Sequence, residues 1–295
     1  MRILVTGAAG YIGSALAKAL AAAHEVLATD QSAPAAIVGN LAYPPFARSL
    51  VTPEVDAVFH LAALVSGGAE QNFELGTKVN LDATRDLLEA CRLAGHGPKF
   101  IFASSIAVYG GVHEVTDETP PAPRLSYGAH KLVCEVLIDD YTRRGFIDGR
   151  ALRLPAVLVR PGGPNTAVSG WSSAIIRESL AGRDYVCPVR PDTRLACISL
   201  NKVVDSFVHA LTLPGEKIGA RRTLPLNGIS VSAQEMSDAV KGKVRFVPDP
   251  AIQAVMDGAP KSVVSKRSAE LGFPASRNID EIVREYEETT LAHHG

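Results

Sequence analysis

Strand-like runs alternate with longer segments of helical periodicity through the first half of the chain. The strand-like runs cover residues 3–5, 25–30, 57–62, 99–105 and 150–159. Helical patterns cover residues 11–23, 70–94 and 127–144, with an interruption expected near Gly76. Apolar runs such as 3–5 are typical of strands buried on both faces of a sheet. The alternation predicts right-handed crossovers and a doubly wound parallel sheet of the α/β class.

The second half of the chain has shorter segments and frequent prolines after Pro161. Helical patterns return at 201–213, 231–241 and 278–293. We expect residues 1–160 to form the main domain and residues 196–230 to return to it. Residues 161–195 and 231–295 would then form a smaller C-terminal lobe.

One predicted helix is apolar on nearly its whole circumference. Within 127–144, the segment Leu132–Ile138 reads LVCEVLI. A helix that only covers a sheet shows one apolar stripe. This helix therefore needs a second buried face, against another subunit or another helix. The alternative is a helix enclosed within one chain.

Composition narrows the possible partners. The chain has 295 residues, is 46% hydrophobic and has a formal net charge of −1. Both signs of charge are scattered, which argues against nucleic-acid or membrane-surface binding. No apolar stretch approaches the ~20 residues of a membrane span. The cysteines lack metal-type pairing, so we expect no metal site, and reduced thiols in a cytoplasmic protein.

Three glycines follow the first strand at a spacing of three residues. They are Gly7, Gly10 and Gly13, and a helical segment follows them. A strand, a glycine turn and a helix N-terminus together suit an anion such as a pyrophosphate. The alternative is a tight turn that is simply rich in glycine.

The second strand ends in an acidic residue, Asp30. A carboxylate about 20 residues after such glycines accepts from the adenosine ribose hydroxyls of a dinucleotide. It also repels a 2′-phosphate, and no Arg or Lys follows it directly. The pattern favours NAD over NADP, with a strand-end cap as the weaker interpretation of Asp30.

A serine, a tyrosine and a lysine carry the candidate chemistry. Tyr127 and Lys131 are four residues apart and share one face of a helix. A neighbouring ammonium lowers the pKa of a phenol and makes it a better general base towards an alcohol. Ser105 ends a strand, where open α/β sheets bind ligands. Taken alone, the Tyr–Lys pair is an ordinary surface pair, and its register with the glycines strengthens the catalytic interpretation.

Five ordered segments carry a family resemblance. They are MRILVTGAAGYIG at the N-terminus, HLAA (60–63), VNLDAT (79–84), SSIAVYG (104–110) and YGAHK (127–131). Together they resemble the extended short-chain dehydrogenase/reductases. The resemblance implies a Rossmann-type NAD-binding domain with a smaller C-terminal substrate-binding lobe. It also implies a homodimer in which the helix containing Tyr127 pairs with the helix near 82–94.

The resemblance assigns roles residue by residue. Ser105, Tyr127 and Lys131 match the catalytic residues of the family. The implied cofactor contacts are Gly7, Gly10, Tyr11, Ile12, Gly13, Asp30, Leu61, Ala62, Ala63, Asn80, Tyr127, Lys131 and Leu154. Of these residues, we expect Asn80 to have a mainly structural role.

The substrate needs a separate argument. Family members that act on nucleotide sugars usually carry polar residues after the position of Arg194, where this chain has Leu195 and Ala196. Segments 65–92, 149–165 and 191–195 resemble, more narrowly, a member that oxidises the C2 hydroxyl of a four-carbon sugar acid. This resemblance implies NAD-dependent oxidation of a small sugar acid. The alternatives are a nucleotide-sugar epimerase or dehydratase, and a non-catalytic NAD-sensing regulator.

A sugar acid needs donors for its carboxylate and hydroxyls. The candidate substrate ligands are Ser66, Ser105, Ser126, Tyr127, Asn165 and Arg194. A structural ion pair for Arg194 and a turn role for Asn165 are equally good interpretations. We expect His60 to be structural. The only tryptophan, Trp171, could line the substrate pocket or belong to the core of the smaller lobe, and the sequence favours neither role.

Overall fold

The computed structural model describes residues 1–162 and 167–291, and it divides the chain into two compact units. The first unit holds residues 1–108, 123–153 and 204–224. The second unit holds residues 109–122, 154–203 and the chain from residue 225 onward. These units differ from the expected domains, because 109–122 and 154–160 join the second unit and the returning segment is shorter than 196–230.

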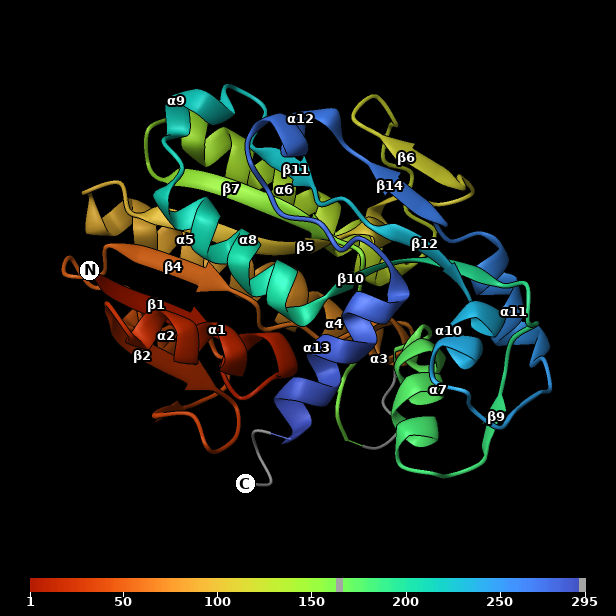
Figure 1. The fold of residues 1–295 in the computed structure, drawn as a ribbon. Coiled ribbons are helices and arrows are strands. Elements are labelled where there is room, and N and C mark those ends of the chain that lie inside the picture. The colour runs from red at the N-terminus through yellow and green to blue at the C-terminus, as the bar shows by residue number, and fades with distance from the viewer. Residues whose placement is uncertain (163–166, 292–295) are drawn as a thin grey trace. The chain divides into compact units, whose positions relative to one another are not determined.

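A seven-stranded sheet forms the centre of the first unit (Figure 1). Its strand order is β3 (Ile37–Val38), β2 (Glu25–Asp30), β1 (Arg2–Thr6), β4 (Ala57–His60), β5 (Lys99–Ser105), β7 (Asp148–Leu154) and β11 (Thr223–Pro225). The pairs β2–β3, β1–β2, β1–β4 and β4–β5 are parallel. The chain adds strands first on one side of β1 and then on the other. The predicted doubly wound sheet is confirmed, and such sheets bind ligands at the carboxyl ends of strands where the order reverses.

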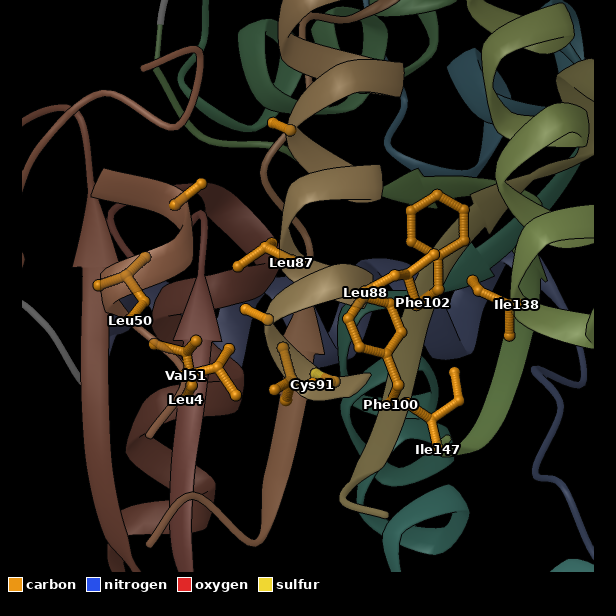
Figure 2. Close-up of a cluster of buried hydrophobic side chains, with 14 of the residues drawn as sticks. Leu4, Leu50, Val51, Leu87, Leu88, Cys91, Phe100, Phe102, Ile138 and Ile147 are labelled. Carbon is orange, nitrogen blue, oxygen red and sulfur yellow. The ribbon is translucent and has the colours of Figure 1, made fainter. Parts of the chain in front are cut away.

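Alternate side chains along the strands face different helices. The helices that cover the sheet are α1 (Tyr11–Ala21), α2 (Pro44–Ser49), α5 (Ala83–Ala94), α6 (Ser126–Arg143) and α8 (Leu200–Thr212). On one face, Phe100 and Phe102 pack with Leu88 of α5 and Ile138 of α6 (Figure 2). On the other face, Phe59 meets the ring of α8 residue Phe207 edge-on, with centroids 6.1 Å apart.

This core fixes the helix that carries the candidate chemistry. Phe102, Leu88 and Ile138 are fully buried, and each such side chain contributes about 1.5–3 kcal/mol. Helix α6 therefore rests on a close-packed support rather than on a flexible surface. The short helices α9 (Gly215–Ile218) and η2 (Ile106–Val108) complete the first unit.

The helical pattern at 70–94 is divided differently from the prediction. It consists of α3 (Ser66–Gln71), α4 (Phe73–Thr77), the π-helical segment η1 (Lys78–Asp82) and α5. The break falls at Asn72, whose side chain accepts from the N–H of Leu75 and caps α4. Gly76 lies inside α4, where a Cβ would come within 3.1 Å of Ala69. The predicted interruption near Gly76 therefore exists, but it falls at Asn72 and in the π-helical segment on either side of this glycine, which itself serves close packing.

The second unit is built from small sheets and short helices. Its sheets are β12 (Ile229–Ser232), β10 (Arg194–Ser199) and β8 (Ala156–Leu158), then β9 (Tyr185–Cys187) with β13 (Val244–Phe246), and β6 (Glu114–Thr116) with β14 (Ser262–Val264). Its helices are α7 (Gly170–Leu180), α10 (Ala233–Ala239), α11 (Pro250–Asp257), α12 (Lys266–Glu270) and α13 (Ile279–Leu291).

The helix expected at 231–241 is shorter than predicted. Val231 and Ser232 belong to β12, and α10 begins at Ala233. Ser232 and Glu235 form a capping box there, with the Ser232 side chain accepting from the Glu235 N–H at 3.1 Å. This Ser-x-x-Glu spacing is the sequence signal that marks the helix start.

None of the helices within 1–162 and 167–291 is long and apolar enough to span a lipid bilayer.

Candidate active site

The glycine turn after β1 is shaped by close backbone contacts. Gly7 has a φ of +73°, and a Cβ there would lie 2.7 Å from the backbone nitrogen of Ala62. A Cβ on Gly13 would collide with the carbonyl oxygen of Gly7. Gly10 is the N-cap of α1, which has no side-chain cap and no acidic residue in its first turn, where Tyr11 lies. The helix N-terminus therefore presents its dipole and N–H groups without a competing carboxylate, as a pyrophosphate requires.

Asp30 lies at the carboxyl end of β2 and supports this turn. Its Oδ2 accepts from the backbone N–H of Ala9 at 3.0 Å. Its Oδ1 lies 3.5 Å from the hydroxyl of Ser32, which makes at most a weak hydrogen bond. Asp30 thus holds the turn with one oxygen and can accept from a ribose hydroxyl with the other.

A buried hydrogen-bond chain fixes the backbone after β4. Thr6 Oγ1 lies 2.7 Å from Nδ1 of His60, whose Nε2 lies 2.9 Å from Thr84 Oγ1. Burial lowers the pKa of His60 to about 3, so its ring is neutral. Thr6 Oγ1 also accepts from the N–H groups of Leu61 and Ala62 at 3.2 Å each. His60 is a structural residue, as expected.

Asn80 fixes the end of the same backbone segment after β4, at Leu64. Its Oδ1 accepts from the N–H of Leu64 at 2.7 Å, and its Nδ2 donates to the Leu64 carbonyl at 2.9 Å. Asn80 lies in the π-helical segment η1 and is 1% exposed. Asn80 therefore has a structural role, because its side chain fixes the backbone of the loop that contains Ala63.

The three predicted catalytic residues lie together in the first unit. Ser105 ends β5, and its hydroxyl is near enough to the phenol of Tyr127 to lower the pKa of that group. Its Oγ also accepts from the Ala107 N–H at 3.1 Å. Lys131 is one helical turn after Tyr127, with its Nζ 5.6 Å from the Tyr127 ring centroid. This Nζ donates to the carbonyl of Ala103 at 2.8 Å.

Burial is the main influence on the pKa values of Tyr127 and Lys131. Burial raises the pKa of Tyr127 to about 12, although the nearby Ser105 hydroxyl acts in the opposite direction. It lowers the pKa of Lys131 to about 8, against the influence of Cys134 and Glu135. The prediction that Lys131 lowers the pKa of this phenol is wrong for this structure, because burial raises the Tyr127 pKa and the opposing influence comes from Ser105.

A glycine allows α6 to approach the end of β5. A Cβ on Gly128 would collide with the carbonyl oxygen of Ala107. Gly128 directly follows Tyr127, and Ala107 comes two residues after Ser105. The contact therefore sets how closely the phenol approaches the serine, a role that the sequence analysis did not assign.

Glu70 of α3 is a second residue that the sequence analysis missed. Helix α6 has no side-chain cap from its own N-cap residue, Leu125. A carboxylate oxygen of Glu70 instead accepts from the backbone N–H of Ser126. This contact joins the helix that begins with Ser66 to the helix that begins with Ser126. No local motif marks it, because the two residues are far apart in sequence.

The remaining candidate ligands have different outcomes. Arg194 binds the carboxylate of Glu235 through two nitrogens at 2.6 and 3.1 Å. The structure thus shows a structural ion pair, one of the two interpretations of Arg194 that the sequence allowed. Asn165 lies outside the described residues. Leu154 is the buried last residue of β7. Trp171 is buried in the apolar core of the second unit.

Comparisons with known proteins agree with this geometry. A model of the NAD-dependent epimerase/dehydratase family matches residues 3–212. The chain belongs to this family. D-erythronate dehydrogenase of Cupriavidus necator is 40% identical over 98% of this chain and 98% of its own length. The Haemophilus influenzae protein of the same name is 38% identical over 97% and 98% of the two chains.

A solved structure from Agrobacterium tumefaciens, described as a nucleoside-diphosphate-sugar epimerase, is similar over the whole fold. It is 36% identical, has a TM-score of 0.92 and covers 99% of this chain and 95% of its own. The predicted family, Rossmann-type fold and NAD dependence are confirmed. The uncapped α1 and the cradle at Gly7 and Gly13 fit the pyrophosphate of NAD.

Proposed function

We propose that this protein is an NAD-dependent dehydrogenase that oxidises the C2 hydroxyl of D-erythronate to a 2-oxo acid. The observation that carries the proposal is the cluster of Ser105, Tyr127 and Lys131 at the carboxyl end of β5. Relatives at 40% and 38% identity over nearly the full chain are D-erythronate dehydrogenases. An intact catalytic cluster argues against a non-catalytic NAD-sensing regulator.

In the proposed mechanism, Tyr127 takes the proton of the substrate hydroxyl and Ser105 donates a hydrogen bond to the same oxygen. NAD⁺ supplies the hydride acceptor and a positive charge when it is bound. Because burial raises the pKa of Tyr127 to about 12, the phenolate needs positive charge nearby at neutral pH. Lys131 supplies such a charge from the next helical turn and can also donate to ribose hydroxyls.

The substrate assignment predicts NADH formation with D-erythronate and slower formation with related four- or five-carbon sugar acids. The first turn of α3, Ser66-Gly67-Gly68, has little side-chain bulk, which suits a compact substrate. The measurement is NADH absorbance at neutral to alkaline pH with a panel of sugar acids. UDP-sugars and dTDP-sugars in the same assay are the comparison. Turnover of a nucleotide sugar, with no activity on any sugar acid, would favour the epimerase alternative.

The role of Asp30 predicts a preference for NAD over NADP. In Asp30→Asn the repulsion of a 2′-phosphate is removed while an acceptor for the Ala9 N–H is kept. The ratio of kcat/KM for NAD to that for NADP should fall about 10–100-fold, since a hydrogen bond to a charged group contributes about 1.5–3 kcal/mol. Ser32→Ala should leave the ratio unchanged. Equal use of both cofactors by the wild type would rule out this role.

We propose a homodimer formed through α5 and α6. Val136 is 62% exposed on the face of α6 opposite buried Ile138, and Val133 and α5 residue Leu93 are also exposed. The predicted second apolar face therefore lies on the surface, as contact with another subunit requires. The four cysteines are free and buried, and a cytoplasmic location is part of the same proposal.

The dimer predicts that Val136→Glu yields a monomer in sedimentation velocity. Burying an unpaired carboxylate costs several kcal/mol, so dissociation should be favoured by at least about 100-fold. Val38→Glu is the matched control, because Val38 is 56% exposed on β3, away from these helices. A wild type that sediments as a monomer at high concentration would contradict the proposal.

A further inference from the structure

A buried ion pair joins α6 to β7 near the catalytic residues. Arg153 donates from Nε to Oε1 of Glu135 at 2.9 Å and from Nη2 to Oε2 at 2.6 Å. Glu135 and Arg153 are 2% and 4% exposed. Two charges so deeply buried carry a large desolvation cost, and an apolar pair of similar size would often be at least as stable. Stability alone is therefore a weak reason for this pair.

The carboxylate of Glu135 also binds the strand that carries Ser105. Ser104, the preceding residue, donates its hydroxyl hydrogen to Oε1 of Glu135. One helical turn earlier, Lys131 donates to the carbonyl of Ala103 at 2.8 Å. Helix α6 is thus tied to two successive residues of β5 immediately before Ser105. A shift of α6 along this strand would break both hydrogen bonds.

The carboxylate of Glu135, which Arg153 binds, also acts on the ammonium of Lys131 by raising its pKa. The titratable groups that surround this ammonium are Tyr127, His130, Cys134 and Glu135 on α6, His60 on β4 and, through Glu135, Arg153 on β7. Burial holds the pKa of Tyr127 near 12 and that of Cys134 near 11, and it lowers the pKa of His60 and His130. These four groups are therefore neutral at pH 7, and the ion pair sets the local charge.

We propose that the Ser104–Glu135–Arg153 network is a positioning device that holds Tyr127 and Lys131 in register with Ser105 and keeps the Lys131 ammonium charged. Glu135 is four residues after Lys131, on the same helix face, so the helix delivers both groups to the end of β5. The proposal rests on the roles proposed above for Tyr127 and Lys131. It assigns no contact with substrate to the network.

The test compares three variants in the full-length protein. Glu135→Gln removes the negative charge and retains an oxygen that can accept from Ser104. The double variant Glu135→Met/Arg153→Met removes both charges and guards against unfolding by an unpaired charge. Asp148→Asn is the control, because it removes a carboxylate that binds Arg150 and Arg222 at the other end of β7. NAD affinity is measured by titration from pH 6 to 10 without substrate, with thermal unfolding alongside.

For the wild type we expect NAD affinity to fall as the pH rises through about 8, where Lys131 loses its proton. In Glu135→Gln this midpoint should move about one unit lower, since the stabilising negative charge is lost and Arg153 is unpaired. The double variant should show a smaller shift. At pH 6.5, where Lys131 stays charged, the kcat of the double variant should still fall about tenfold, because α6 loses its register with β5.

The control Asp148→Asn should lower the unfolding temperature and keep the wild-type midpoint. A midpoint that is the same in the wild type and in folded Glu135→Gln would overturn the role in charge. A double variant with wild-type kcat would overturn the role in register. The NAD titration needs no substrate, so failure of D-erythronate to react would refute the proposed function and leave the test of the charge role intact; the test of the register role then uses whichever sugar acid or other alcohol the enzyme oxidises.

Discussion

Replacing Tyr127 with phenylalanine should reduce turnover by about 10²–10⁴-fold, the usual contribution of general acid–base catalysis. The ring keeps its shape and its place at the first turn of α6, so the fold should persist. NAD binding should change little, because Lys131 is held by the Ala103 carbonyl rather than by the phenol. The measurements are steady-state NADH formation and an NAD titration of the variant.

Tyr141→Phe is the matched control on the same helix. Its hydroxyl lies 3.2 Å from Glu89 and has no part in the catalytic cluster. This variant should retain wild-type turnover while losing one partly exposed hydrogen bond. Near-normal turnover in Tyr127→Phe with the true substrate would require a different base and would end the proposed mechanism.

Replacing Gly128 with alanine should damage catalysis although alanine favours helices. Propensity alone would stabilise α6 by roughly 1 kcal/mol. The added Cβ would collide with the Ala107 carbonyl, and relief of such overpacking typically costs about 1–3 kcal/mol. The start of α6 must then move away from the end of β5. A displacement of about 1 Å between Tyr127 and Ser105 is enough for a loss of about 10²-fold in kcat.

Ala129→Gly tests whether the effect belongs to helix stability. Ala129 is exposed on the same turn, so this variant destabilises α6 by about 1 kcal/mol without touching Ala107. It should lower the unfolding temperature and keep kcat. Equal kcat in Gly128→Ala and the wild type would show that the close approach is not needed for the reaction.

The sequence predicts the parts of the site that depend on local spacing. The three glycines are three residues apart, and the structure shows the positive φ of Gly7 and the crowding at Gly13 that only glycine tolerates. Tyr127 and Lys131 are one helical turn apart, so any helix places them on the same face. Strand β5 covers Lys99–Ser105, as its apolar run predicts. These features follow from backbone geometry over a few residues.

The ends of strands and helices are less well predicted, because one sequence pattern can be divided between different sheets or helices in the tertiary structure. The run 150–159 reads as one strand, yet it forms β7 and β8 in two separate sheets. Pro155 separates them, because it has no N–H for a strand ladder and restricts the residue before it. The pattern in 70–94 likewise predicts a helix with one interruption near Gly76, while capping by Asn72 and the π-helical segment divide it at two other places.

Short ordered motifs and their spacing were enough to predict the family and the doubly wound fold, and they also single out Ser105, Tyr127 and Lys131 as candidate catalytic residues. The tertiary structure alone decided which distant charges meet: Glu70 with the N-terminus of α6, Glu135 with Arg153, and Arg194 with Glu235. The protonation of Tyr127 also depends on the tertiary structure, because burial raises the pKa of the phenol to about 12. Desolvation and ion pairing depend on everything packed around a group, and residues far apart in sequence supply most of those neighbours.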